Sequence, residues 1–276
     1  MTLSTSRIAF VGGGNMARSL IGGLARAGMP GARIAVGEPN AALREALARD
    51  FGVAVHADGA DAARGADAIV LAVKPQTMKS VCAGLREVAQ ASSPLIVSIA
   101  AGIRIEQLDA WLGGGCAIVR AMPNTPALIG AGASGLVGNA RVDADKRALA
   151  AAILDAAGIA VWIDDESQMD TVTALSGSGP AYFFLLVEAL EDAAVAQGLP
   201  RDTARALATQ TCLGAGRMLR EDVDAPAELR ARVTSPNGTT QAAVESFEAS
   251  GLRAIVARAV AAATQRGHEL SAQLDD

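Results

Sequence analysis

The chain has 276 residues, of which 51% are hydrophobic and 19% are charged, so it is long enough for two domains with their own cores. Its net charge of −5 excludes the dense basic face that nucleic-acid binding requires and favours small-molecule chemistry. Cys82, Cys116 and Cys212 are widely spaced and have no CxxC pattern or neighbouring histidine. We therefore expect reduced thiols, no disulfide framework and no metal site.

The location of the protein is predicted from two further features of the sequence. No apolar run reaches the roughly 18 residues that a membrane span needs. The first residues lack the basic and apolar regions of a signal peptide. We therefore expect a cytoplasmic protein that acts on a small molecule, with no nucleic-acid or membrane partner.

The first 163 residues alternate short apolar runs with amphipathic segments, the pattern of a parallel sheet flanked by helices. The runs AIVLAV and LIVSIA show no polar alternation, which predicts central strands covered on both faces. The predicted strands are residues 7–11, 33–37, 53–55, 68–73, 95–99, 117–121 and 159–163.

After residue 163 the sequence has only helix-like segments, predicted at 169–175, 180–197, 201–219, 241–250 and 252–270. Residues 1–163 carry a net charge of +3 and the remainder −8, which supports a boundary there. We predict an α/β domain over 1–163 and an all-α domain over 164–276. The run YFFLLVEAL is too apolar for a helix with one wet face, so that helix is either a core helix or part of a subunit interface.

A glycine-rich turn follows the first predicted strand, and a helix is predicted after it at about residues 15–27. The turn reads Gly12, Gly13, Gly14, Asn15, Met16, Ala17, which matches G-x-G-x-x-A in the required strand-turn-helix context. Gly12 permits the tight turn, and Gly14 lets a pyrophosphate approach the backbone. The N–H groups of the helix start then favour the phosphates, so the turn predicts a dinucleotide site.

Glu38 ends the second predicted strand, 24 positions after Gly14, close to where an acidic residue bonds the ribose 2′-hydroxyl of NAD. This position favours NAD over NADP. In the alternative interpretation Glu38 faces solvent and Asn40 caps the next helix. Arg44 is near enough in sequence to reach a phosphate.

Two further strand ends and three polar stretches are candidate ligand sites. AVKP and AAG end the fourth and fifth strands at the carboxyl edge, where open α/β sheets bind ligands. MPNTP, SGSGPAY and TSPNGTT interrupt the rest of the chain, and the last two expose several backbone N–H groups at a helix start, which suits a carboxylate.

The motifs FVGGGNMA, AVKPQ, VSIAAG, RAMPNTPA, ALSGSGPAYFF and VTSPNGTT, in this order, resemble those of pyrroline-5-carboxylate reductase over essentially the whole chain. The resemblance implies NAD(P)H-dependent reduction of 1-pyrroline-5-carboxylate to L-proline, the last step of proline biosynthesis. It also implies a Rossmann-type dinucleotide-binding domain followed by an all-helical dimerisation domain. The substrate site would lie at the interface of a homodimer, and dimers would assemble into larger rings.

The resemblance also assigns residues, with Thr240 near the imine nitrogen as the catalytic residue. The implied cofactor-binding residues are Val11, Gly12, Gly13, Gly14, Asn15, Met16, Gly37, Glu38, Ala72, Val73, Lys74, Pro75, Ile99, Ala100 and Ala101. The implied substrate-binding residues are Asn124, Ser176, Gly177, Ser178, Ser235, Asn237, Gly238, Thr239 and Thr240. The cofactor is NADP(H) or NAD(H), because the family often prefers NADPH and Glu38 favours NADH.

The chain departs from the family pattern at two further positions. Gly59 stands where relatives often carry an Asn beside the adenosine, which puts that contact in doubt. Asn237 stands where some relatives have Gly, and this is tolerable if the backbone there is left-handed, a conformation that Asn also adopts.

The predicted helical domain, residues 164–276, has few groups that could donate a proton: no lysine, one histidine (His268) and one tyrosine (Tyr182). Carbonyl reduction usually needs such a donor, whereas a cyclic imine can arrive already protonated. Related hydroxyacid dehydrogenases carry a lysine at the position that aligns with Phe183, so its absence argues against that rival activity. Two other hypotheses remain. A dinucleotide sensor without catalysis leaves the polar loops unexplained, and a pure dimerisation module leaves the glycine turn unexplained.

Overall fold

The structure is a computed structural model that describes residue 3 and residues 5–274. It contains two compact units. The first runs up to Ser178 and also includes the residues from Ala263 onward, and the second is Gly179–Ala262. The boundary expected at residue 163 falls inside the first unit, and the division at 1–163 and 164–276 stays a prediction.

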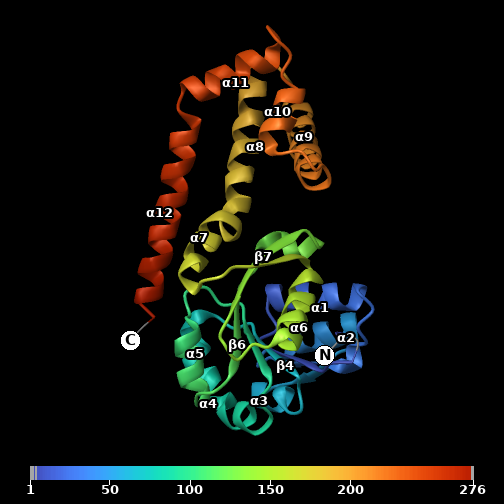
Figure 1. Cartoon of the computed structure of the whole chain (residues 1–276). Helices are drawn as coiled ribbons and strands as arrows, with labels where there is room; N and C mark the ends of the chain where they lie inside the picture. Colours follow the sequence, from blue (N-terminus) through green and yellow to red (C-terminus); the bar gives the residue numbers. More distant parts are fainter. Residues whose placement is uncertain (1–2, 4, 275–276) are drawn as a thin grey trace. The chain divides into compact units, whose positions relative to one another are not determined.

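One eight-stranded sheet, in the order β3-β2-β1-β4-β5-β6-β7-β8, forms the centre of the first unit (Figure 1). Adjacent strands are parallel from β3 to β6, whereas β7 is antiparallel to β6 and parallel to β8. The strand order reverses between β1 and β4, and open sheets bind ligands outside the carboxyl ends of the strands at such a point. The strands are β1 (Ile8–Val11), β2 (Ile34–Gly37), β3 (Ala54–His56), β4 (Ala68–Leu71), β5 (Leu95–Ser98), β6 (Ala117–Met122), β7 (Gly132–Gly138) and β8 (Gly158–Trp162).

Helices cover both faces of this sheet. Ile8 and Phe10 of β1 lie in a core with α1, α2 and α6, whereas Ala9 and Val11 lie in a second core with α3, α4 and α5. This alternation explains why the strands are apolar throughout. The helical segments are α1 (Asn15–Arg26), η1 (Gly31–Arg33), α2 (Ala41–Phe51), α3 (Gly59–Ala63), α4 (Pro75–Ser92), α5 (Ile105–Leu112), η2 (Thr125–Ile129), α6 (Ala144–Asp155), η3 (Glu166–Gln168), α7 (Met169–Val172) and η4 (Thr173–Gly177), a π-helical turn.

All seven predicted strands are present within two residues at each end, but the sequence did not predict β7. Its sequence, GASGLVG, contains three glycines, which are depleted in strands. The structure explains one of them, because a Cβ on Gly135 would lie 2.5 Å from Cγ1 of Val172 in α7. Close packing of α7 on β7 therefore requires glycine at position 135. Because glycine has a low strand propensity, the same residue kept the sequence from predicting the strand.

The second unit is helical, as predicted. It contains α8 (Gly179–Ala196), α9 (Arg201–Glu221), α10 (Pro226–Arg232), α11 (Thr239–Ala249) and the first residues of α12 (Leu252–Ala272), of which α10 was not predicted (Figure 1). In the described part of the chain, no helix has both the length and the apolar character needed to cross a membrane.

The apolar run of α8 is exposed in the chain. The exposed fractions of Phe183, Phe184 and Leu185 are 59%, 67% and 65%. The interpretation of α8 as a core helix of the chain is therefore wrong. Large apolar side chains exposed along one helix are typical of a protein interface.

Glu191 is the one buried carboxylate of α8, with 7% of the residue exposed. Arg205 of α9 donates to both of its oxygens at 3.1 Å, and Nη1 of Arg201 donates to Oε1 at 3.0 Å. These hydrogen bonds, first those from Arg205, hold the pKa of Glu191 below its ordinary 4.5. They join α8 to α9 through a charge-assisted pair.

We expect Glu191→Gln to lower Tm at neutral pH, because one arginine then loses its charged partner. The folded-state pKa of Glu191 is depressed, so its stabilisation is complete above the unfolded pKa and is lost as pH falls through the lower folded value. The Tm difference between wild type and variant should therefore shrink in acid. Glu188→Gln, an exposed site on the same helix, is the control. A Tm difference for Glu191→Gln that stays constant down to strongly acidic pH would contradict this role.

Candidate active site

The glycine turn lies directly after β1 at the point where the strand order reverses. Gly12 has φ +99°, and a Cβ there would lie 2.6 Å from the carbonyl oxygen of Ala72, so only glycine fits. Gly14 is the N-cap of α1, no side chain caps this helix, and a Cβ on Gly14 would meet open space. Asn15 is exposed and Met16 is half-buried at the helix start. The first turn of α1 therefore presents backbone N–H groups to an open region.

Glu38 reaches back from the end of β2 to this turn. Gly13 N–H donates to Oε2 at 2.8 Å, and Asn40 N–H donates to Oε1 at 2.9 Å. The alternative in which Glu38 faces solvent is therefore wrong in this structure. Asn40 does cap α2, because its side chain accepts from Leu43 N–H at 3.2 Å. The Asn40 cap is therefore present as expected, together with a contact of Glu38 to the glycine turn that the sequence did not predict.

A cavity of about 280 Å³ lies beside the end of β1. Gly59 lines it, and a Cβ on Gly59 would lie 2.8 Å from Cγ1 of Val11. Position 37 also has to be glycine, because a Cβ there would lie 2.5 Å from Cα of Gly59. The lining residues are Val11, Asp58, Gly59, Ala60, Ser80, Val81, Gly84 and Leu85.

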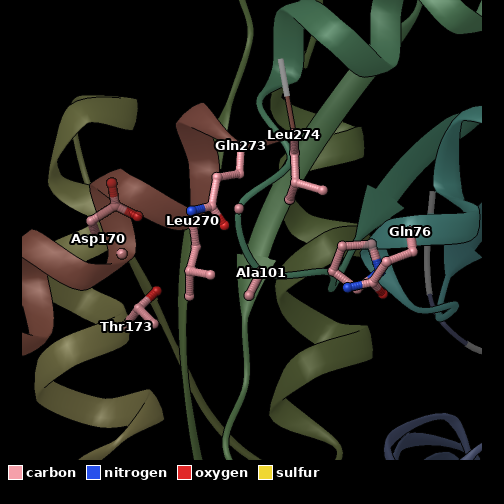
Figure 2. A pocket seen from close by; sticks show the side chains of 10 residues that line it. Gln76, Ala101, Asp170, Thr173, Leu270, Gln273 and Leu274 are labelled. Atoms are coloured by element: carbon pink, nitrogen blue, oxygen red, sulfur yellow. The ribbon is translucent and has the colours of Figure 1, made fainter. Parts of the chain in front are cut away.

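A second cavity, of about 210 Å³, lies at the ends of β4 and β5 (Figure 2). It includes Pro75 and Ala101, two of the predicted cofactor residues, while Lys74 is the exposed N-cap of α4. Ala72, Val73, Ile99 and Ala100 lie beside these residues at the same strand ends. The remaining lining residues are Gln76, Gly102, Asp170, Thr173, Gly267, Leu270, Gln273 and Leu274.

The last turns of α12 form one wall of this second cavity, which the sequence did not predict. Figure 2 shows Leu270, Gln273 and Leu274 on this wall, with Leu270 between Thr173 and Ala101. The helical periodicity of residues 252–270 predicts a helix but carries no signal for its contacts. Nothing in the sequence therefore indicated that the chain end contributes to this edge of the sheet.

A buried arginine fixes that wall. Arg120, 4% exposed, donates from Nη1 to Oε1 of Glu166 at 3.1 Å, and its Nη2 lies 4.0 Å from Oδ1 of Asp170. Asp170 also contacts Nδ1 of His268 on α12 at 2.8 Å. The single histidine of the second half of the sequence is thus joined to a carboxylate of the sheet-containing unit.

Asn124 and the SGSG turn are brought together. Nδ2 of Asn124 donates to the carbonyl oxygen of Ser176 at 2.9 Å, and Oδ1 accepts from Ala133 N–H at 2.9 Å. Ser176 and Gly177 belong to the π-helical turn η4, which Ser178 N–H closes onto the carbonyl of Thr173. Such turns occur often at functional sites. The described contacts of Asn124 fix the backbone of two predicted substrate segments.

The SPNGTT loop lies in the second unit, at the start of α11. Asn237 has φ +59°, which confirms the left-handed conformation expected where some relatives have Gly. Its N–H donates to Oε1 of Gln241 at 2.7 Å, which fixes the loop on the helix. Ser235 accepts from Gly238 N–H at 3.1 Å through its carbonyl oxygen.

The start of α11 resembles that of α1. Gly238 is the N-cap and no side chain caps the helix. Thr239 and Thr240 are the first two helical residues. Their backbone N–H groups lie in the first turn, where no intrahelical acceptor exists. The loop can therefore bind an anion through main-chain donors, with the Thr240 hydroxyl beside them.

The thiols are poor candidates for nucleophiles. Cys82 and Cys116 are buried, Cys212 is half-buried, and all three are free, as predicted. Burial, with a smaller effect of the neighbouring Cys116, raises the pKa of Cys82 to about 12. Its thiolate is therefore scarce at neutral pH.

Comparisons with known proteins agree with this arrangement. The model of the pyrroline-5-carboxylate reductase dimerisation domain matches residues 166–270, and that of NADP oxidoreductase, coenzyme F420-dependent, matches residues 7–102. A pyrroline-5-carboxylate reductase of Pseudomonas aeruginosa is 54% identical over 274 residues, covering 99% of both chains.

Solved structures give the same result. A pyrroline-5-carboxylate reductase from Coxiella burnetii matches with a TM-score of 0.95 and 43% identity, covering 96% of this chain and 98% of that one. A pyrroline carboxylate reductase from Plasmodium falciparum, with NADP bound, matches with a TM-score of 0.83 and 30% identity, covering 98% and 100%. The predicted fold class, a Rossmann-type domain followed by a helical dimerisation domain, is confirmed. Near-complete coverage at this identity means that the chain belongs to the pyrroline-5-carboxylate reductase family, whose members are NAD(P)-dependent oxidoreductases.

Proposed function

We propose that the chain reduces 1-pyrroline-5-carboxylate to L-proline with NAD(P)H, the last step of proline biosynthesis. One observation carries the proposal: α1 and α11 both begin at a glycine N-cap without a side-chain cap, one at the sheet's switch point and one in SPNGTT. The first suits a diphosphate and the second suits a carboxylate. The activity that gives the family its name needs both anions to be held.

The residues at the carboxyl edge fit a nicotinamide coenzyme. The open space at Gly14 suits the diphosphate, and the cavity beside Val11 and Gly59 suits the adenosine. The cavity beside Pro75 and Ala101 suits the nicotinamide end. A bound coenzyme supplies the hydride. The chain contributes the N–H groups, the small residues and the walls that hold it.

The substrate carboxylate would bind to the N–H groups of Thr239 and Thr240, and the Thr240 hydroxyl would bond the ring nitrogen. A cyclic imine that arrives protonated has an electrophilic carbon, so the chain needs no ionisable proton donor of its own. Its contribution is to position the ring, and correct positioning can lower a barrier by about 7 to 11 kcal/mol. Asn124 and residues 176–178 are the other residues that we propose contact the substrate.

The complete site would form across a homodimer. Two observations support this: the SPNGTT loop and the coenzyme loops belong to different compact units, and the apolar side chains of α8 are exposed in the single chain. A dimer would cover the exposed side chains of α8. This agrees with the match of residues 166–270 to the family model of the pyrroline-5-carboxylate reductase dimerisation domain. The assembly of dimers into a ring and a cytoplasmic location stay predictions.

Substitutions at Gly14 and Gly12 should affect coenzyme binding and thermal stability separately. Gly14→Ala should leave Tm nearly unchanged, because its Cβ meets open space, but should raise the Kd for NADH and NADPH about tenfold or more by obstructing the diphosphate. Gly12→Ala, strained by φ +99° and a 2.6 Å contact, should lower Tm. Isothermal titration and thermal melting measure both effects. Wild-type affinity in Gly14→Ala would remove the turn from coenzyme binding.

The activity is tested by the oxidation of NADH and NADPH in the presence of 1-pyrroline-5-carboxylate. We expect turnover by the wild type and a roughly 10- to 100-fold lower kcat for Thr240→Ala, which loses one hydrogen bond to a charged group of about 1.5 to 3 kcal/mol. The coenzyme Kd should not change. Thr203→Ala, an exposed threonine of α9, is the control. No oxidation of either coenzyme would refute the proposed function, and full turnover by Thr240→Ala would refute only its role.

A further inference from the structure

The carboxylate of Glu38 is fixed against the glycine turn. Both of its oxygens accept main-chain hydrogen bonds, one from Gly13 at 2.8 Å and one from Asn40 at 2.9 Å. A Cβ on Gly13 would lie 3.2 Å from both Cβ and Cγ of Glu38, so the Glu38 side chain lies along the glycine turn. Its charge therefore stays beside the segment that would hold the adenosine diphosphate, at the end of β2.

The nearby arginines are held by other groups. Nη1 of Arg44 donates to the carbonyl oxygens of Glu38 and Pro39, at 2.6 and 2.8 Å. Within the described residues, no ion pair joins Arg44 to the Glu38 carboxylate. Arg18 forms an ion pair with Asp50 and lies over the ring of Phe51. The charge of Glu38 is thus stabilised by peptide dipoles while these two guanidinium groups are held by other partners.

A second carboxylate lies beside the neighbouring cavity. Asp58 lines the 280 Å³ cavity and caps α3 by accepting from Ala60 N–H at 2.7 Å. The turn that carries it touches the residue before Glu38, because a Cβ on Gly37 would lie 2.5 Å from Cα of Gly59. An adenosine in this cavity would have carboxylates on two neighbouring strand ends.

We propose that Glu38 makes this chain select NADH over NADPH. The inference rests on the proposed function, which supplies the coenzyme, and it names the residue that chooses between the two forms. A ribose 2′-hydroxyl can donate to the fixed carboxylate. A 2′-phosphate brings two negative charges to a carboxylate that cannot turn away without breaking its bonds to Gly13 and Asn40, and like charges in such contact repel strongly.

The test is a binding measurement on the full-length protein. Titration with NADH and with NADPH gives the ratio of the two Kd values without turnover. We expect wild-type protein to bind NADH about tenfold more tightly or better, and Glu38→Gln, which removes the charge at nearly constant shape, to bring the ratio within about threefold of unity. Glu45→Gln, an exposed site on α2, removes a charge away from the turn and should keep the wild-type ratio.

Each outcome of this titration decides a separate point. Equal or tighter binding of NADPH by the wild type, or an unchanged ratio in Glu38→Gln, would overturn the role of Glu38 and leave the reductase activity standing. Binding of neither coenzyme would refute the proposed function itself. If Glu38→Gln fails to fold, wild-type titrations at low and high salt take its place, because screening of the repulsion should reduce the preference for NADH. A preference that salt does not alter would overturn the proposal.

Discussion

Backbone N–H groups at the starts of two helices are the donors on which the proposed site depends. Gly14 opens α1 and Gly238 opens α11, and no side chain caps either helix. By contrast, Asn40, Asp58 and Asp143 cap α2, α3 and α6 with their own side chains. A helix start without a side-chain cap does not by itself make a binding site, because α9 also lacks a side-chain cap. What distinguishes α1 and α11 is a glycine N-cap in a turn that the sequence motifs single out, and at Gly14 a Cβ would meet open space.

This arrangement explains how the chain can act with so few ionisable groups. The protonated imine brings its own charge, so the protein has to hold a carboxylate and a ring rather than to deliver a proton. Of the two groups named as possible proton donors, His268 contacts Asp170. At this edge of the sheet, Glu38 is the carboxylate that we propose selects between the two coenzymes.

The sequence predicted those parts that depend on local patterns. Strands with continuous apolar runs and the turn at Gly12 follow from periodicity and backbone sterics, whereas the left-handed conformation at Asn237 was expected from the family resemblance. It did not predict β7, because Gly135 is demanded by the approach of Val172 across a tertiary contact. The end of α12 at the second cavity was also missed, since a helical pattern does not say what it packs against. The sequence left α8 either in the core or at an interface, because an apolar run is equally typical of both, and the exposure of Phe183 excludes the core of the chain.

The anchoring of the substrate carboxylate is tested most directly by comparing kcat/KM for 1-pyrroline-5-carboxylate with that for 1-pyrroline, which has the same ring without the acid group. If the first turn of α11 holds the carboxylate with two charge-assisted hydrogen bonds, each of about 1.5 to 3 kcal/mol, 1-pyrroline should be reduced roughly 10² to 10⁴ times less efficiently. Equal kcat/KM for the two imines would contradict carboxylate anchoring.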